Sequence, residues 1–153
     1  MAKPESSFDT VGVTSYETSF LMAQSGKAFY TLLATCLGHH GLITSEWSFL
    51  GGLYPDKTLR PTDLATELNL SPAYVTRILG DLMRKQYVTA AHHVEDARSK
   101  EYRLTQEGRA LIERVEPMLK DCLRQQFAGL PAEYLRIYFE TAQYIAQHVA
   151  HRS

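Results

Sequence analysis

The sequence predicts a mainly helical α+β fold: a winged helix-turn-helix with long N- and C-terminal helices that form a dimerisation region. Three observations lead to this prediction. Two short helical patterns meet at a sharp joint near Asn69. Two short extended runs follow directly and predict a β-hairpin. Longer helical patterns with wide apolar stripes lie on both sides of this middle region.

Size and composition set the first limits. The chain has 153 residues, of which 44% are hydrophobic and 22% charged, as in one ordinary globular domain. No apolar run approaches the roughly 20 residues that cross a bilayer. The first ten residues, MAKPESSFDT, lack the apolar stretch of a secretory signal. We therefore expect a cytoplasmic protein with no membrane partner.

The chain divides into three kinds of segment. Residues 1–14 are polar and predict a flexible arm, and residues 15–41 and 106–153 predict the helical dimerisation region. Residues 42–105 predict the winged helix-turn-helix lobe. The net charge of the chain is −1, but residues 57–103 carry eight Lys or Arg and six Asp or Glu, a net charge of +2. Phosphate contacts are therefore expected in this middle part.

The first two helices are predicted from apolar spacing and capping signals. Apolar residues recur at helical spacing from Tyr16 to about Leu37, and the glycines that follow end this helix. Thr44 is predicted to be the N-cap of a second helix that runs to about Gly51. Glu46 stands in its first turn, where a negative charge is favourable.

The helix-turn-helix is predicted between Leu64 and Leu82, LATELNLSPAYVTRILGDL. Residues 62–68 form its first helix, after Pro61. Ser71 and Pro72 read as an N-cap and an N1 proline that open the second helix, which runs to about Lys85. Two amphipathic helices joined by a short turn also occur in any helical core, so the pattern alone has low specificity.

The second helix has two distinct faces. Val75, Leu79 and Leu82 are predicted to point into the core. Four residues fall on the opposite face, where a recognition helix meets the major groove: Ala73, Tyr74, Thr76 and Arg77. Arg77 is able to bond a guanine through two hydrogen bonds, and the amides near Ser71 are able to meet a phosphate.

The hairpin and the terminal helices complete the pattern. Residues 87–92 and 101–104 are predicted strands on either side of a charged loop, HVEDARSK. Thr105 is predicted to cap a long helix that Pro117 bends, and Gly129-Leu130-Pro131 separates it from a last helix at about residues 132–148. The apolar stripes of the terminal helices exceed what one small lobe covers, which predicts pairing with a second copy; packing within one chain is the alternative.

The sequence resembles the MarR family of bacterial regulators. The matching residues are Leu42-Ile43-Thr44-Ser45-Glu46-Trp47, Leu50, Leu64-Ala65, Leu68, Val75-Thr76-Arg77, Leu79, Leu82, Asp96-Ala97-Arg98 and Leu104-Thr105-Gln106-Glu107-Gly108. The D-x-R segment followed by L-T-x-x-G is the most specific part. The resemblance implies a transcription regulator, expected to be a repressor, that acts as a homodimer on a pseudopalindromic site in double-stranded DNA.

The resemblance also implies roles for single residues. Arg98 is expected to enter the minor groove, and Asp96 to orient a helix arginine, here Arg77. The residues expected to contact DNA are Arg60, Thr62, Ser71, Pro72, Ala73, Tyr74, Thr76, Arg77, Asp96, Arg98 and Lys100. The chain departs from the family's pattern where Met83-Arg84-Lys85-Gln86-Tyr87 lacks a glycine, where residues 88–91 lack an arginine, and where Arg60 replaces a small hydroxyl residue.

A small aromatic or phenolic effector is the other partner that the resemblance implies. The candidates to line its pocket are Tyr30, Leu33, Leu37, His39, Trp47 and Leu50, all of which also suit an ordinary core. No cofactor and no metal are expected, because the pairs His39-His40 and His92-His93 lack spaced ligand partners.

Three alternatives remain open. A winged helix that binds only protein is disfavoured by the exposed Thr76, Arg77, Arg98 and Lys100. An enzyme is not expected, because the chain has no nucleophile elbow, phosphate loop or zincin motif. Cys36 and Cys122 each lie in a helical apolar pattern and are predicted to be small buried hydrophobic side chains. A redox-sensing thiol is the alternative for them.

Overall fold

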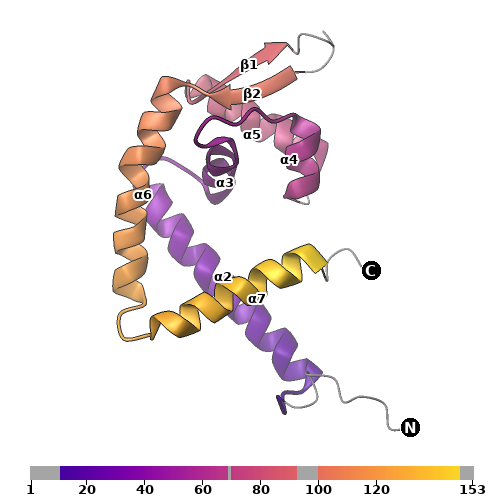
Figure 1. The fold of residues 1–153 in the computed structure, drawn as a ribbon, viewed down its shortest axis with the longest axis vertical. Helices are drawn as coiled ribbons and strands as arrows, with labels where there is room; N and C mark the ends of the chain where they lie inside the picture. The colour runs from indigo at the N-terminus through magenta and orange to yellow at the C-terminus, as the bar shows by residue number, and fades with distance from the viewer. Residues whose placement is uncertain (1–10, 69, 93–99, 149–153) are drawn as a thin grey trace, which may run out of the picture. The chain divides into compact units, whose positions relative to one another are not determined.

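A computed structural model describes residues 11–68, 70–92 and 100–148. The elements in order are α2 (Ser15–Gly38), α3 (Thr44–Leu53), α4 (Pro61–Glu67), α5 (Pro72–Arg84), β1 (Val88–His92), β2 (Lys100–Leu104), α6 (Gln106–Gln126) and α7 (Ala132–His148) (Figure 1). The predicted mainly helical fold with one small antiparallel sheet is confirmed. The chain divides into two compact units, Met1–Leu119 and Lys120–Ser153, and α6 crosses the boundary between them.

The N-terminus of α2 is closed by a reciprocal pair of hydrogen bonds. The hydroxyl of Thr14 accepts a hydrogen bond from the Glu17 N–H at 3.1 Å, and the Glu17 carboxylate accepts one from the Thr14 N–H at 2.9 Å. This is a capping box, which satisfies backbone donors that the helix itself leaves without partners. The backbone N–H and then the hydroxyl of Thr14 hold the pKa of Glu17 below its ordinary value.

The predicted N-cap of α3 is wrong by one residue. Ile43 occupies the N-cap, and Thr44 is the first helical residue and is buried. The Glu46 carboxylate accepts a hydrogen bond from the Ile43 N–H at 3.0 Å. The carboxylate at the third helical position therefore gives a partner to the backbone N–H of the N-cap residue.

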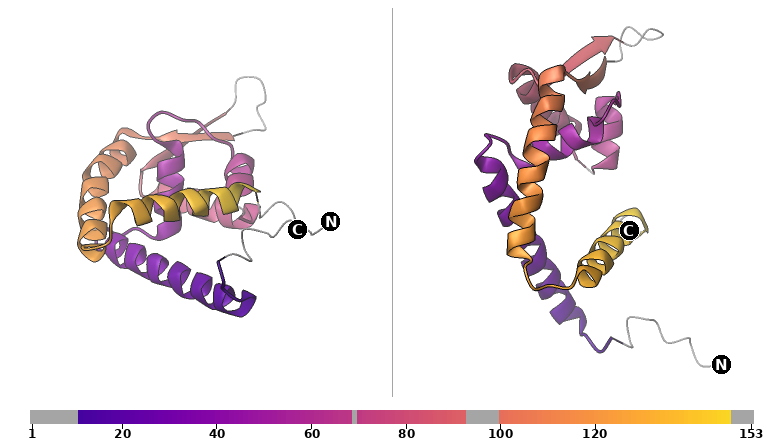
Figure 2. Two further views of the ribbon diagram at one scale, coloured as in Figure 1. Left: turned by 60° about the horizontal axis from the view of Figure 1, so that its bottom comes forward. Right: turned by 60° about the vertical axis from the view of Figure 1, so that its left-hand side comes forward.

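The sheet is a short antiparallel hairpin. Val88 pairs with Leu104 at its base and His92 with Lys100 at its far end. Leu59, which precedes α4, adds an isolated bridge to Tyr102, with N–O distances of 3.1 and 2.9 Å. Figures 1 and 2 show the strands beside α3, α4 and α5. Tyr102 is buried and Arg103 is exposed, which confirms the predicted alternation in the second strand.

The core of the first unit lies between α2, α3, α4, α5 and the start of α6. Its largest fully buried side chains are Phe49, Leu37, Leu50, Leu53, Leu64, Ile78, Leu79, Leu82, Val75 and Val115. The three residues of α5 predicted to point inward are among them, with no exposed surface. Each such side chain stabilises the lobe by roughly 1.5–3 kcal/mol relative to an exposed position. This core fixes which face of α5 remains outside.

Helix α6 joins the hairpin through one glycine and one threonine. The Thr105 hydroxyl donates to the Gln86 carbonyl at 2.7 Å and accepts from the Gly108 N–H at 3.0 Å, so the predicted cap is confirmed. A Cβ at residue 108 would lie 2.1 Å from the Tyr87 carbonyl oxygen. The helix therefore approaches the start of β1 at a distance that only glycine permits.

The end of α5 adopts a Schellman motif. The Gln86 N–H donates to the Met83 carbonyl at 2.9 Å, and the Tyr87 N–H to the Leu82 carbonyl at 3.0 Å. Gln86 has a φ of 63° and is the only described residue other than glycine with a positive φ. The left-handed conformation that the motif requires is therefore taken by a residue with a Cβ, within the segment of residues 83–87 that lacks the glycine of the MarR pattern.

The second unit contains the end of α6 and all of α7. Gly129, with a φ of 91°, lies between them, and no residue of α7 is buried. Its exposed apolar side chains include Tyr134, Ile137 and Tyr144. None of the helices in the described ranges is long and apolar enough to cross a membrane.

Candidate nucleic-acid interface

The N-terminal end of α5 presents a polar surface outside the core. The Ser71 side chain accepts a hydrogen bond from the Tyr74 N–H at 3.3 Å, and Pro72 follows as the first helical residue. Ser71, Pro72, Ala73, Thr76 and Arg77 are all exposed. The Thr76 hydroxyl donates to the Pro72 carbonyl at 2.9 Å. The residues predicted to face the major groove therefore share one accessible face, and their contacts with DNA stay a prediction.

Tyr74 differs from its neighbours because it is only partly exposed. Its hydroxyl is hydrogen-bonded to the Ser45 hydroxyl of α3, at 2.7 Å. The guanidinium carbon of Arg77 lies 4.8 Å from the centre of the Tyr74 ring. Tyr74 thus links α3 to the arginine of α5, an arrangement that the sequence pattern did not suggest.

Arg77 retains most of its accessibility in this arrangement. Its side chain is 57% exposed, and its Nη1 lies 3.8 Å from the Asp81 carboxylate one turn further along α5. Arg84 pairs with the same carboxylate. The sequence resemblance assigned the acidic partner of Arg77 to Asp96; Asp96 and Arg98 both lie outside the described residues.

The other predicted DNA contacts lie at the edges of the lobe. Arg60 is the N-cap of α4, where its N–H donates to the Asp63 carboxylate at 3.3 Å, and Thr62 stands in the first turn. Lys100 is the first residue of β2. The side chains of Arg60, Thr62 and Lys100, which were predicted to contact DNA, are all exposed.

The predicted effector residues are divided between core and surface. Leu37 and Leu50 are fully buried, whereas Tyr30 is 62% exposed. His39 is also exposed, and Leu33 and Trp47 are intermediate. The structure places the two leucines in the lobe's core, which is the ordinary role that the sequence allowed for them.

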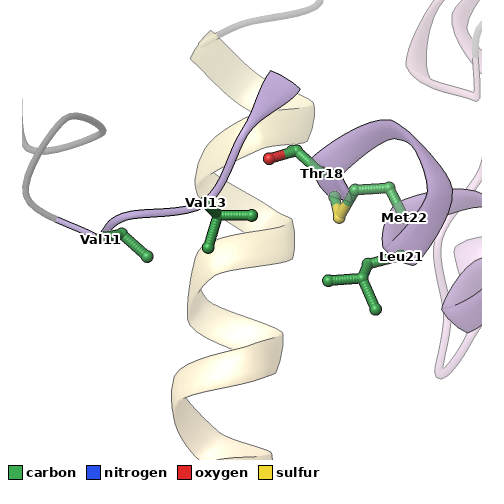
Figure 3. Close-up of a pocket in the computed structure, with 5 residues that line it drawn as sticks. All are labelled: Val11, Val13, Thr18, Leu21 and Met22. Atoms are coloured by element: carbon green, nitrogen blue, oxygen red, sulfur yellow. The ribbon is translucent and has the colours of Figure 1, made fainter. Parts of the chain in front are cut away.

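An apolar cavity lies elsewhere, at the start of α2. It has a volume of about 240 Å³ and is lined by Val11, Val13, Thr18, Leu21 and Met22. Figure 3 shows the two valines on the segment before the helix and the other three residues on its first two turns. The sequence pattern did not mark this cavity, because the polar residues 1–14 predict a flexible arm; the two valines beside a helix start are the signal that points to it.

A second, polar cavity lies at the base of the hairpin. It has a volume of about 200 Å³, and Asp56, Lys57, Arg103 and Arg109 are its charged lining residues. Asp56 and Arg109 form an ion pair. Their hydrogen bond raises the pKa of the Arg109 guanidinium above its ordinary value, against the opposing effect of burial. This cavity carries an excess of positive charge that no sequence motif marked.

The described residues form no metal site, and the two cysteines differ in burial. Among the described residues, no group of three or more His, Cys, Asp or Glu side chains could hold a metal ion. Cys36 is buried and Cys122 partly exposed. The prediction of a small buried side chain is confirmed for Cys36 but not for Cys122, and neither cysteine is a free thiol.

The fold is a winged helix-turn-helix, and one family model matches the middle part of the sequence. Residues 42–100 match the model of the MarR family. This segment begins before α3 and ends at the start of β2, so it contains the candidate interface. The predicted resemblance to the MarR family is confirmed over residues 42–100.

Two relatives from Bacillus subtilis (strain 168) match in sequence. The HTH-type transcriptional repressor YetL is 40% identical over 62 residues, which cover 40% of this chain and 37% of that protein. The uncharacterized HTH-type transcriptional regulator YdgJ is 30% identical over 100 residues, 65% of this chain and 61% of that protein. The matches thus span less than two thirds of either relative.

Three solved structures share the fold. A MarR-family transcriptional regulator from Rhodococcus sp. RHA1 has a TM-score of 0.78 at 21% identity, covering 88% of this chain and 96% of that one. CouR from Rhodococcus jostii RHA1, bound to p-coumaroyl-CoA, has a TM-score of 0.74 at 21% identity over 84% and 91%. A MarR mutant from E. coli complexed with operator DNA has a TM-score of 0.74 at 19% identity over 83% and 91%.

Proposed function

We propose that this protein is a sequence-specific DNA-binding transcription regulator, a repressor that acts as a homodimer in the bacterial cytoplasm. The observation that carries the proposal is the division of α5 into two faces. Val75, Leu79 and Leu82 have no exposed surface, while Arg77, four residues before Asp81, keeps a 57% exposed side chain. A helix anchored in this way is suited to lie in a major groove.

The relatives support the same function. YetL is named as a transcriptional repressor, and the E. coli MarR mutant of the same fold is complexed with operator DNA. We propose that this chain also acts as a repressor and binds operator DNA. Its DNA contacts would come from Arg60, Thr62, Lys100 and the exposed residues of α5. Asp96 and Arg98 are proposed to complete the interface.

Fluorescence anisotropy with labelled duplexes tests the proposal. Fragments from the DNA that flanks the protein's own gene should include one that binds more tightly than scrambled DNA of equal length and composition. The affinity should fall as the salt concentration rises, because Lys and Arg displace counterions from phosphates. Equal affinity for all duplexes across the salt series would instead indicate a lobe that does not read sequence.

Exposed apolar residues support the homodimer. Tyr16, Phe20, Leu21, Met22 and Tyr30 lie on α2, and Tyr134, Ile137 and Tyr144 on α7, all more than 45% exposed in the single chain. Surfaces of this kind mark protein contacts. Two recognition helices related by a twofold axis would then match half-sites about 10–10.5 base pairs apart.

We propose an aromatic effector on the strength of CouR, whose structure contains p-coumaroyl-CoA. Trp47 is the only tryptophan of the chain and is one of the proposed lining residues with Tyr30, Leu33, Leu37, His39 and Leu50. A phenolic carboxylate should quench Trp47 fluorescence and weaken DNA binding by a linked amount. A panel of such compounds that changes neither signal would remove the support for this part of the proposal.

A further inference from the structure

Tyr74 lies between Ser45 of α3 and the arginine that the proposed function assigns to base recognition. We propose that Tyr74 is a positioning residue that fixes the direction of the Arg77 guanidinium, and that Ser45 anchors it. The sequence pattern assigned Tyr74 to a direct DNA contact. This inference rests on the proposed function, since it concerns how the same face reads a base.

Tyr74 is held at both ends. Its N–H donates to the Ser71 side chain at 3.3 Å, which fixes its backbone in the first turn of α5. Its hydroxyl is hydrogen-bonded at 2.7 Å to Ser45, 29 residues earlier in the chain. Ser45 stands in the first turn of α3, next to the buried Glu46. The ring is therefore a rigid platform rather than a mobile surface side chain.

Arg77 lies on this platform. Its guanidinium carbon is 4.8 Å from the ring centre, within the range of a cation–π interaction. The Asp81 carboxylate lies 3.8 Å from Nη1. The ring and the carboxylate together restrict a long side chain that otherwise has many rotamers. A fork of hydrogen bonds to guanine requires one orientation, and restricting the free side chain lowers the entropy lost on binding.

A direct contact of Tyr74 with DNA would use the same hydroxyl differently. The hydroxyl already has a partner in Ser45, and the side chain is only partly exposed. That bond uses part of the hydroxyl's hydrogen-bonding capacity and restrains the ring, which limits its movement toward a base or phosphate. The observed geometry therefore favours action through Arg77 over action on the DNA itself.

The geometry is tested first in the protein without DNA. Ring-current shifts should move the Arg77 side-chain proton resonances in the wild type and in Tyr74→Phe, which keeps the ring. The shifts should disappear in Tyr74→Leu. Unshifted Arg77 resonances in the wild type would overturn the inference without touching the proposed DNA-binding function, because this measurement involves no DNA.

The second test is a double-mutant cycle on the operator. Tyr74→Leu should weaken operator binding about fivefold, as expected for one cation–π interaction. Tyr74→Leu should also bind the operator with less preference for the correct base at one position. That position is the base pair whose identity no longer affects binding in Arg77→Ala. In the Arg77→Ala background the same tyrosine change should have no further effect. An equal loss in both backgrounds would overturn the inference, since Tyr74 would then act independently of Arg77.

Two serines of α3 provide the matched comparison. Ser45→Ala should weaken operator binding about twofold to threefold, since it removes a single hydrogen bond. Ser48→Ala should leave binding unchanged, because the Ser48 hydroxyl donates only to its own helix, at the Thr44 carbonyl. Circular dichroism and thermal unfolding check that each variant is folded. If Arg77→Ala itself binds the operator like the wild type, the proposed interface is wrong, and the inference falls with it.

Discussion

The ammonium group of Lys85 lies 2.8 Å from Oε1 and 2.9 Å from Oε2 of Glu46, and it also donates to the Gly41 carbonyl at 2.8 Å. Lys85 caps the C-terminus of α5, and Glu46 lies in the first turn of α3. The Glu46 side chain is only 4% exposed. One lysine therefore joins the far end of the proposed recognition helix to the helix that supports its start.

The first prediction concerns this ion pair. Lys85→Met would leave a buried carboxylate without its cation, and we expect the free energy of unfolding to fall by about 2 kcal/mol, less than for a fully buried pair because Lys85 is 38% exposed. Urea denaturation measures it. Lys57→Met is the control, because in the described part of the chain Lys57 forms no ion pair. Equal stability of the two variants would contradict the prediction.

The second prediction concerns Gln86. A residue with a Cβ at a φ of 63° pays a conformational penalty that glycine avoids, so Gln86→Gly should raise the free energy of unfolding by about 1 kcal/mol. Gly41→Ala makes the opposite change at a φ of 68° and should lower it by a similar amount. Thermal unfolding of both variants measures these changes. Changes of the same sign in the free energy of unfolding would contradict the prediction.

The third prediction concerns the pH dependence of the α2 cap. The hydrogen bonds from Thr14 lower the pKa of Glu17 in the folded protein. Its contribution to stability is therefore fully present above the pKa of the unfolded chain and is lost as the pH falls through the folded pKa. A titration followed by NMR should place the Glu17 carboxyl below an ordinary glutamate. In Thr14→Val, which keeps the backbone N–H and removes the hydroxyl, the pKa should move part of the way back upward; an unchanged pKa would exclude the Thr14 hydroxyl as a cause.

The fourth prediction concerns DNA recognition. Arg77→Ala should cost about 1–3 kcal/mol in operator affinity and relax specificity at one base pair of each half-site. Arg98→Ala should weaken binding with a smaller change in base preference, because the minor groove carries less base information. Arg124→Ala, on the exposed part of α6 in the second unit, is the control. Anisotropy on the operator and on single-base variants gives the comparison.

The fifth prediction concerns assembly. Light scattering at micromolar concentration should give about twice the chain mass of 17.3 kDa. Ile137→Glu places a charge on an apolar side chain of α7 that is 46% exposed, and it should shift the mass toward the monomer. Met83→Glu, at a similarly exposed apolar residue of α5, should remain dimeric. A wild-type chain that is monomeric at every concentration measured would contradict the proposed dimer, in which two recognition helices bind one operator.

The sequence predicted the helix-turn-helix because its information is local. Val75, Leu79 and Leu82 recur at the spacing of one helical face, and Ser71 with Pro72 marks a helix start. These features need no knowledge of the rest of the chain. The predicted bounds of α5 and of the two strands consequently agree with the structure to within one or two residues.

The contacts that organise the candidate site were not predictable in the same way. Lys85 and Glu46 are 39 residues apart, and Tyr74 and Ser45 are 29 residues apart. Each pair depends on how two helices pack and on which rotamers the side chains adopt. The Thr44 cap was wrong by one residue because local signals do not fix a helix start that closely: the N-cap is Ile43, whose N–H donates to the Glu46 carboxylate.

The contact between Gly108 and the Tyr87 carbonyl changes what the L-T-x-x-G motif means. Its glycine is required because a Cβ would lie 2.1 Å from a backbone oxygen, and its threonine because the hydroxyl links the Gln86 carbonyl, between α5 and β1, to the first turn of α6. Neither demand involves DNA. A chain that had lost every phosphate contact would still be under selection to keep this signature. Motif searches that rely on it therefore find the wing's attachment to its helix, and the capacity to read DNA must be judged from the side chains of α5.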